Sequence, residues 1–256
     1  MPQFVSDGVS IAYAVYGGGP PVLLIHGFAS SAQINWGATG WVETLTAAGY
    51  QAIAIDNRGH GQSEKFYDAE RYWAHLMADD AVRLLDHLGS AQAAVIGYSM
   101  GARIAAFLAL RHPHRVSCAI LGGMGLNLVH GLADADAIIA GLEAATLEEL
   151  THKSARQFRI FADQSNADRK ALAACMVTSR EPMAAGDVRK IEAPVLVAVG
   201  ELDEMAGRPE ALAELLPRGE AVVIPRRNHM LATGDARFKA AALAFLARHA
   251  PPIRQM

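Results

Sequence analysis

The chain has 256 residues, of which 52% are hydrophobic and 19% charged, so it is long enough to fold around a substantial core. Its net charge of −3 and scattered basic residues give no electrostatic reason to expect nucleic acid or an anionic membrane as a partner. The N-terminus lacks the pattern of a signal peptide, and no apolar run approaches the length of a membrane span. The only cysteines, Cys118 and Cys175, suit a reducing compartment. We therefore expect a cytoplasmic protein.

Apolar runs predict strands that alternate with helices. Residues 9–16 alternate between apolar and polar side chains, which is typical of a strand near a sheet edge, and the glycines and prolines that follow force a turn. Further strands are expected at about 22–26, 51–55, 92–96, 117–121, 195–199 and 221–224. Helices are expected near 41–48, 69–88, 100–111, 207–216 and 235–249. This alternation predicts an α/β protein with a mostly parallel sheet that helices cover on both faces.

The segment 125–190 breaks this alternation. It contains no convincing strand, and its apolar residues recur at helical spacing instead. Helices are expected over 135–145, 147–161 and 167–178.

The most informative motif is Gly97-Tyr98-Ser99-Met100-Gly101, which fits G-x-S-x-G between a short apolar strand and an Ala- and Leu-rich helix. A serine on so sharp a turn has its hydroxyl pushed out of the backbone, and a Cβ at either glycine would clash with the neighbouring strand and helix. The context predicts that Ser99 is a nucleophile. The alternative is a glycine-rich turn with a helix-capping serine.

A nucleophilic serine needs a base and an acid, and both follow in the expected order. The apolar run 193–199 ends at Gly200, which puts Asp203 just beyond a strand end. The run 221–224 is followed by His229. Ligands bind at the carboxyl ends of parallel strands, so these side chains can converge with Ser99. The order serine, acid, histidine is the one expected of a single fold.

Two more segments complete a family pattern. The strand 22–26 ends in His26-Gly27, and residues 56–63 read Asp-Asn-Arg-Gly-His-Gly-Gln-Ser, which is similar to a D-x-R-G-x-G-x-S turn. Together with the serine motif, these segments make the chain resemble the α/β-hydrolase family over nearly its whole length, with serine esterases and cofactor-free haloperoxidases among the members it is similar to.

The resemblance implies a fold and a division of the chain. It implies the α/β-hydrolase fold, with a mostly parallel central sheet flanked by helices and a small helical cap. Residues 1–124 and 191–256 would form the core, and residues 125–190 would form the cap over the active site. Apolar cap side chains such as Phe158 and Phe161 would either line an acyl or alcohol pocket or pack within the cap.

The resemblance also assigns roles to residues. His229 would take the proton from Ser99, and Asp203 would hold the tautomer of His229. The backbone N–H groups of Phe28 and Met100 would form the oxyanion hole. No cofactor is implied, and no histidine pair has the spacing and context of a metal site.

Other acids and histidines have competing interpretations. Asp203 fits the family's G-x-x-D pattern, whereas Glu201 and Glu204 flank it as alternatives. Asp56 is a further alternative, although it is expected to hold its own turn. The base belongs after the last strand in this fold, so His26 is expected to shape the oxyanion loop, and His60, between two glycines, is expected to be structural.

The chain differs from some branches of the family in its motifs, and these differences argue against the functions of those branches. A serine nucleophile argues against haloalkane dehalogenases and epoxide hydrolases, which attack through a carboxylate. The segment His26-Gly27-Phe28-Ala29, in place of His-Gly-Gly-Gly, argues against the hormone-sensitive-lipase branch.

We therefore predict a serine hydrolase that cleaves small carboxylic esters through an acyl-enzyme. Short- to medium-chain esters are favoured because the cap is small. C–C bond hydrolysis, lactone hydrolysis and perhydrolysis remain alternatives with the same triad. A non-catalytic ligand receptor on the same fold is the alternative of a different class. The oligomeric state is left open.

Overall fold

The computed structural model describes residues 1–252, and within them eight strands form one sheet in the order β1-β2-β4-β3-β5-β6-β7-β8. The pairs β1–β2 and β2–β4 are antiparallel and all other pairs are parallel. The predicted mostly parallel sheet is thus confirmed, and the sequence reasoning missed only the short edge strand β1. The strands are β1 (Gln3–Ser6), β2 (Val9–Tyr16), β3 (Pro21–Ile25), β4 (Gln51–Ile55), β5 (Ala93–Tyr98), β6 (Val116–Gly122), β7 (Val195–Gly200) and β8 (Gly219–Ile224).

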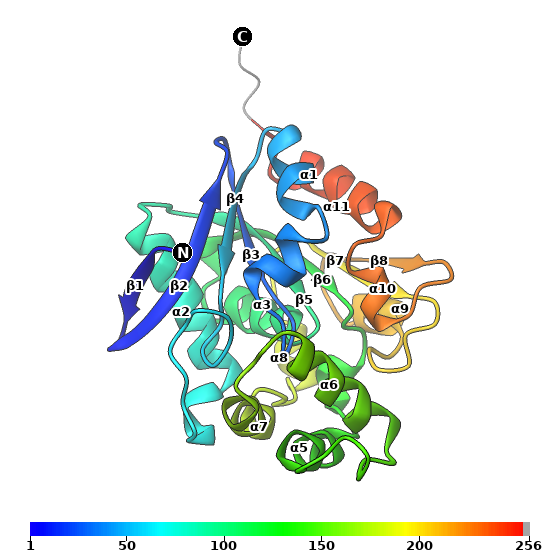
Figure 1. Ribbon diagram of the computed structural model, residues 1–256. Coiled ribbons are helices and arrows are strands. Elements are labelled where there is room, and N and C mark those ends of the chain that lie inside the picture. The colour runs from blue at the N-terminus through cyan, green and yellow to red at the C-terminus, as the bar shows by residue number, and fades with distance from the viewer. Residues whose placement is uncertain (253–256) are drawn as a thin grey trace.

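Helices cover both faces of this sheet (Figure 1). Side chains alternate between the faces of a strand, so Leu23 and Ile25 of β3 pack with α2 and α3, whereas Val22 and Leu24 pack with α1 and α11. The helices outside residues 125–190 are α1 (Trp41–Ala47), α2 (Ala74–His87), α3 (Met100–Arg111), α9 (Pro209–Ala213), α10 (His229–Ala232) and α11 (Ala236–His249), with shorter helical turns at Gln33–Gly37, Ala69–Tyr72 and Pro113–Arg115.

The predicted helix 69–88 is interrupted at Trp73. The backbone of Trp73 is extended (φ −53°, ψ 138°), so a short 3₁₀ turn capped by Asp68 precedes α2. Trp73 is the position at which the local backbone geometry overrides an otherwise continuous helical pattern.

Residues 125–190 form only helices in the structure. They are α4 (Asn127–His130), α5 (Ala135–Glu143), α6 (Lys153–Gln164), α7 (Arg169–Thr178) and α8 (Ala185–Val188), between β6 and β7. α5 packs against α6 and α7, and Figure 1 shows these three grouped apart from the helices that flank the sheet. We call residues 125–190 the helical insertion. Their assignment as a separate cap stays a prediction.

α6 is shorter at its start than the sequence predicts. It begins at Lys153 rather than near Leu147, because His152 has extended backbone (φ −75°, ψ 126°) and forms its N-cap. Residues 147–150 instead form one isolated turn, closed by the hydrogen bond from Leu150 N–H to the Leu147 carbonyl.

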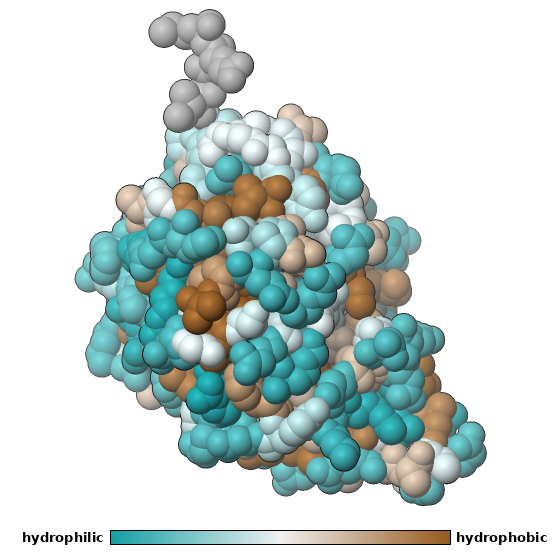
Figure 2. Space-filling view, turned by 60° about the vertical axis from the view of Figure 1, so that its left-hand side comes forward, coloured by the Kyte–Doolittle hydropathy of each residue, from teal (hydrophilic) through white to brown (hydrophobic). Residues whose placement is uncertain are grey.

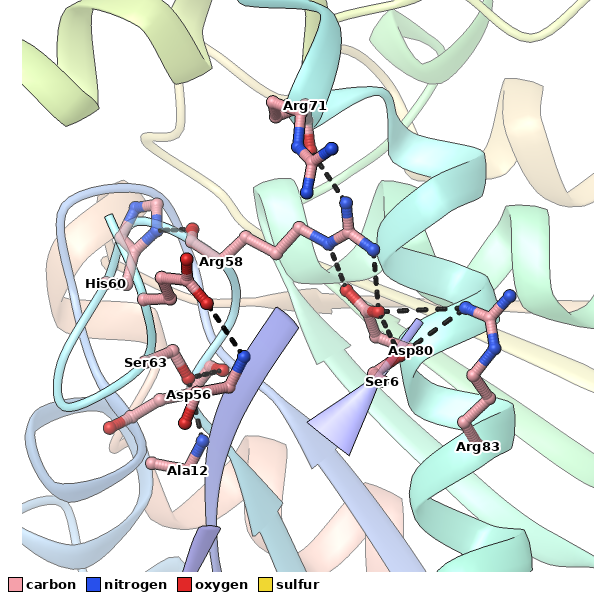
Figure 3. A network of polar contacts seen from close by, with 11 residues as sticks. Ser6, Ala12, Asp56, Arg58, His60, Ser63, Arg71, Asp80 and Arg83 are labelled. Atoms are coloured by element: carbon pink, nitrogen blue, oxygen red, sulfur yellow. Dashed lines mark hydrogen bonds and ion pairs between the residues drawn. The ribbon is translucent and has the colours of Figure 1, made fainter. Parts of the chain in front are cut away.

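A buried polar network links the turn after β4 to α2 (Figure 3). The guanidinium of Arg58 binds both carboxylate oxygens of Asp80 at 2.5 and 2.9 Å, with both side chains almost fully buried. The carboxylate of Asp56 accepts the backbone N–H groups of Ala32 and Gln62 at 2.7 and 2.8 Å. Asp56 therefore holds its turn to the loop after β3.

The face of the molecule seen in Figure 2 is mostly polar. On the face shown in Figure 2, hydrophilic residues surround separate, smaller groups of hydrophobic ones. Among residues 1–252, each helix is too short or too polar to cross a bilayer.

Candidate active site

Ser99 lies on a strained turn between β5 and α3. Its backbone is in the left-handed region (φ 53°, ψ −113°), which a residue with a side chain rarely adopts. A Cβ added to Gly97 would lie 2.2 Å from the Gly101 carbonyl oxygen, and one added to Gly101 would lie 2.0 Å from that of Ile25. Both glycines are thus needed for the close approach that the sequence predicted.

A hydrogen bond links the loops after β7 and β8, and this places Asp203 beside His229. The N–H of Leu202 donates to the carbonyl of Arg227 at 2.9 Å. Gly200 permits the contact, because a Cβ there would lie 2.2 Å from the same carbonyl oxygen. His229 begins α10, and its backbone carbonyl accepts a hydrogen bond from the Tyr98 hydroxyl.

The three predicted side chains form one hydrogen-bonded chain. Asp203 Oδ2 lies 2.7 Å from His229 Nδ1, and His229 Nε2 lies 3.0 Å from Ser99 Oγ. The other oxygen of Asp203 accepts the N–H groups of Met205 and Ala206 at 2.9 and 3.1 Å, and its side chain is fully buried. A carboxylate can only accept, so Nδ1 carries the proton and the Nε2 lone pair faces the serine hydroxyl.

The competing acids lie elsewhere. Glu201 accepts the N–H of Arg226 at the surface, and Glu204 forms an exposed ion pair with Lys153. Neither contacts His229 in the structure. Of the candidate carboxylates, Asp203 is therefore the one placed against the histidine.

The two predicted oxyanion donors carry free N–H groups. Among the hydrogen bonds of residues 1–252, none is donated by the backbone N–H of Phe28 or of Met100. Met100 directly follows Ser99, and Phe28 belongs to the loop that packs beside it, where a Cβ on Gly27 would lie 3.5 Å from the Ser99 Cβ. Free donors next to the nucleophile are what an oxyanion hole requires.

His26 has a defined tautomer. The backbone N–H of Asn57 donates to His26 Nε2 at 3.0 Å, so the proton must sit on Nδ1, which donates to the Gly27 carbonyl at 2.7 Å. Burial lowers the pKa of His26 to about 4, against the opposing effect of the Gly27 carbonyl. His26 is therefore neutral near pH 7, and it contacts the loop after β3 rather than Ser99.

His60 is also buried and neutral. Its Nδ1 lies 2.8 Å from the Arg58 carbonyl, and its ring lies 5.1 Å from that of His26 and 5.8 Å from that of Phe28. Burial, followed by the neighbouring His26, lowers the pKa of His60 to about 3. His60 packs against Phe28 in the loop after β3.

Two cavities meet at Ser99. Both are bordered by Phe28, Ser99, Phe158 and His229. Phe158, from α6, stacks edge-on against Phe28 with ring centroids 5.6 Å apart. The first cavity is also lined by Met100, Arg103, Gly123, Met124, Asn127, Gly131, Leu132, Met176, Ser179, Arg180 and Met205. The second is also lined by Gly27, Ser30, Ile34, Asn35, Thr39, Tyr98, Phe161, Met230 and Thr233.

The sequence alone leaves the roles of Phe158 and Phe161 open and does not single out Arg103. Phe158 borders both cavities and also packs in the core, whereas Phe161 borders only the second cavity. Arg103 is a charged residue in an otherwise apolar stretch of α3, and this exception to the pattern was the available signal.

Within residues 1–252, no group of three or more His, Cys, Asp or Glu side chains is arranged to hold a metal ion. What the site presents is a serine hydroxyl beside a histidine nitrogen and two unpaired backbone N–H groups.

Comparisons with known proteins show the family to which the chain belongs. The family model for the alpha/beta hydrolase fold matches residues 20–158. A protein of Bacillus subtilis (strain 168), provisionally named 2-succinyl-6-hydroxy-2,4-cyclohexadiene-1-carboxylate synthase, is 30% identical over 253 residues, covering 88% of this chain and 90% of that protein.

Two solved structures are similar over almost the whole chain. Est816, described as an N-acyl homoserine lactone degrading enzyme, is 26% identical with a TM-score of 0.77, covering 95% of this chain and 100% of that one. The esterase EaEST from Exiguobacterium antarcticum shares the fold at 21% identity, with a TM-score of 0.80 and coverage of 96% and 99%. The chain belongs to the α/β-hydrolase family.

Proposed function

We propose that the protein is a serine hydrolase that cleaves short- to medium-chain carboxylic esters through an acyl-enzyme. The observation that carries this proposal is the hydrogen-bonded chain of Ser99, His229 and Asp203, with distances of 3.0 and 2.7 Å. The two free N–H groups beside Ser99 support it, because a tetrahedral intermediate needs such donors for its oxyanion.

In the first half of the reaction, the hydroxyl oxygen of Ser99 attacks the ester carbonyl carbon, and its proton passes to His229 Nε2. The oxyanion that forms is stabilised by the N–H groups of Phe28 and Met100. The C–O bond of the ester then breaks, and the leaving alcohol takes the proton from His229. Asp203 stabilises the imidazolium throughout.

In the second half, His229 takes a proton from water while the water oxygen attacks the acyl carbon. The bond to Ser99 breaks, the carboxylic acid leaves, and the serine regains its proton from His229. Two cavities that meet at the nucleophile suit this sequence, because an ester has one substituent on each side of the reacting carbonyl.

The mostly apolar first cavity favours an acyl chain of modest length. Its lining includes the flexible apolar side chains of Met124, Leu132 and Met205. A lactone is an internal ester and would follow the same steps. A panel of linear esters, lactones, a 1,5-diketone and a peracid assay separates ester hydrolysis from lactone, C–C and peroxy chemistry.

The proposal is tested with p-nitrophenyl acetate and butyrate. Ser99→Ala should lower kcat/KM by at least about 10³-fold, since removing a triad member removes most of the catalysis. Ser154→Ala is the matched control, because its hydroxyl binds Asp134 in the helical insertion and should leave activity intact. Full activity in Ser99→Ala would refute the mechanism. A wild type that neither cleaves esters nor reacts with a fluorophosphonate at Ser99 would indicate a receptor instead.

A further inference from the structure

Arg103 is a buried cation whose hydrogen bonds to backbone carbonyls all go to the helical insertion, beside a long contact of 4.0 Å with the Met124 sulfur. It lies on α3, four residues after Ser99, and is 3% exposed. Its Nη1 donates to the carbonyls of Leu128 and Glu181 at 3.0 and 2.6 Å, and its Nη2 donates to that of Asn127 at 3.0 Å. Within residues 1–252 it forms no ion pair at 4.0 Å or less.

The three carbonyls stand at the two ends of the insertion. Asn127 and Leu128 belong to α4, directly after the chain leaves the core, and Glu181 lies between α7 and α8, near its return. We call residues 125–131 and 180–184 the two ends of the insertion. These ends also bind each other, because the N–H of Met183 donates to the Leu128 carbonyl at 2.9 Å. A single side chain of the nucleophile helix therefore holds both ends of the insertion.

We propose that Arg103 is a positioning residue that fixes the acyl-chain length accepted by the first cavity, by holding both ends of the helical insertion against α3. This inference rests on the proposed ester hydrolysis for its choice of substrates. Arg103 and Asn127 both line the first cavity, so a movement of these ends relative to α3 moves the cavity wall. The nucleophile itself is placed by the β5–α3 turn and does not depend on this contact.

The shape of the guanidinium matters for this role. Its planar fork presents donors in fixed directions, so Nη1 and Nη2 reach carbonyls on both ends at once, whereas a lysine ammonium is a single point of attachment. Arg180 offers a matched comparison. It lines the same cavity, but its hydrogen bonds go to Val177 and Asp136, which both lie within the insertion.

The experiment compares Arg103→Met, Arg103→Lys and Arg180→Met with the wild type. Amide hydrogen exchange is followed over residues 125–131 and 180–184, and kcat/KM is measured for p-nitrophenyl esters from acetate to octanoate. Arg103→Met should raise exchange at both ends by about tenfold or more, and should flatten the chain-length profile by a comparable factor. The exchange rates and the chain-length profile of Arg103→Lys should be intermediate between those of Arg103→Met and the wild type. Arg180→Met should leave exchange at both ends at the wild-type rate.

Unchanged exchange at either end in Arg103→Met would overturn the proposal. It would also fail if the chain-length profile kept its shape while all rates fell together. If Arg103→Met does not fold, Arg103→Lys decides by the same criteria. If the wild type cleaves no ester, the proposed function fails, and the exchange data alone show whether Arg103 holds the ends.

Discussion

His26 Nδ1 donates to the carbonyl oxygen of Gly27 at 2.7 Å, and that carbonyl belongs to the same peptide unit as the N–H of Phe28. A peptide unit is planar and trans, so its C=O and N–H point in opposite directions. Ser30 N–H binds the same oxygen at 3.3 Å. Fixing the Gly27 carbonyl therefore also fixes the direction of the Phe28 N–H.

A pair of substitutions at His26 tests this relationship. The amide of His26→Asn can occupy the place of Nδ1 and still donate to Gly27, whereas that of His26→Gln reaches the place of Nε2 and keeps only the contact with Asn57. His26→Gln should lower kcat by about 10²- to 10³-fold with little change in KM, the usual effect of losing an oxyanion donor. His26→Asn should recover much of that loss. Equal kcat values in the two variants would contradict a role in aligning the peptide.

The buried histidines make stability depend on pH. The pKa values of His26 and His60 are lowered to about 4 and about 3, so in the unfolded chain, where the value is about 6.5, both bind protons more readily. Their contribution to stability is complete above pH 6.5 and is lost as the pH falls toward 4. A change from pH 7.5 to pH 5 should lower the free energy of unfolding by about 2 kcal/mol for each of the two histidines.

Urea unfolding at the two pH values measures this effect. His60→Gln serves as the comparison, because it removes one of the two titrating groups and should halve the loss. A wild-type free energy of unfolding that is the same at pH 7.5 and pH 5 would contradict the burial of neutral histidines.

The choice of acid is tested by Asp203→Asn. The amide keeps the size of the side chain but cannot hold the Nδ1–H tautomer of His229, so kcat should fall by about 10⁴-fold while the melting temperature changes little. Glu201→Gln is the control, since its carboxylate binds Arg226 N–H at the surface and should leave kcat within a few-fold. The assignment would be wrong if Glu201→Gln lost activity and Asp203→Asn did not.

Phe158 should control substrate preference as well as stability. It borders both cavities and is 7% exposed, so Phe158→Ala should join the cavities, change kcat/KM unevenly across acyl lengths, and cost about 3–5 kcal/mol of stability. Leu142→Ala is the matched control, because Leu142 is buried in α5 and borders neither cavity. It should lower the melting temperature without altering the shape of the profile. If kcat/KM across acyl lengths kept the wild-type pattern in Phe158→Ala, the role of Phe158 would be purely structural.

The strand ends of this fold could be predicted from local pattern, because apolar runs bounded by Gly200 or followed by turn residues mark them directly. The G-x-S-x-G glycines could be predicted because the motif is short and fixed, although the contact that requires Gly101 is with Ile25 on the neighbouring strand. The roles of side chains in the helical insertion could not be predicted in this way. Whether Phe158 lines a cavity depends on how α6 packs against the Phe28 loop, more than a hundred residues away in the sequence.

Arg103 illustrates the same limit. Its position in an apolar helix indicates an unusual role, but its three short hydrogen bonds go to backbone carbonyls. Every residue has such a carbonyl, so the sequence cannot show which ones Arg103 binds. Contacts of this kind become visible only when the tertiary structure is known.

Ser99 should become acylated during turnover. The direct measurement is intact-protein mass spectrometry of samples quenched with acid during hydrolysis of p-nitrophenyl butyrate, followed by peptide mapping. We predict a butyryl adduct on the peptide that contains Ser99, which should accumulate further when slow deacylation is imposed by a bulky acyl group. Hydrolysis at full rate with no adduct, or an adduct confined to another residue, would rule out an acyl-enzyme at Ser99.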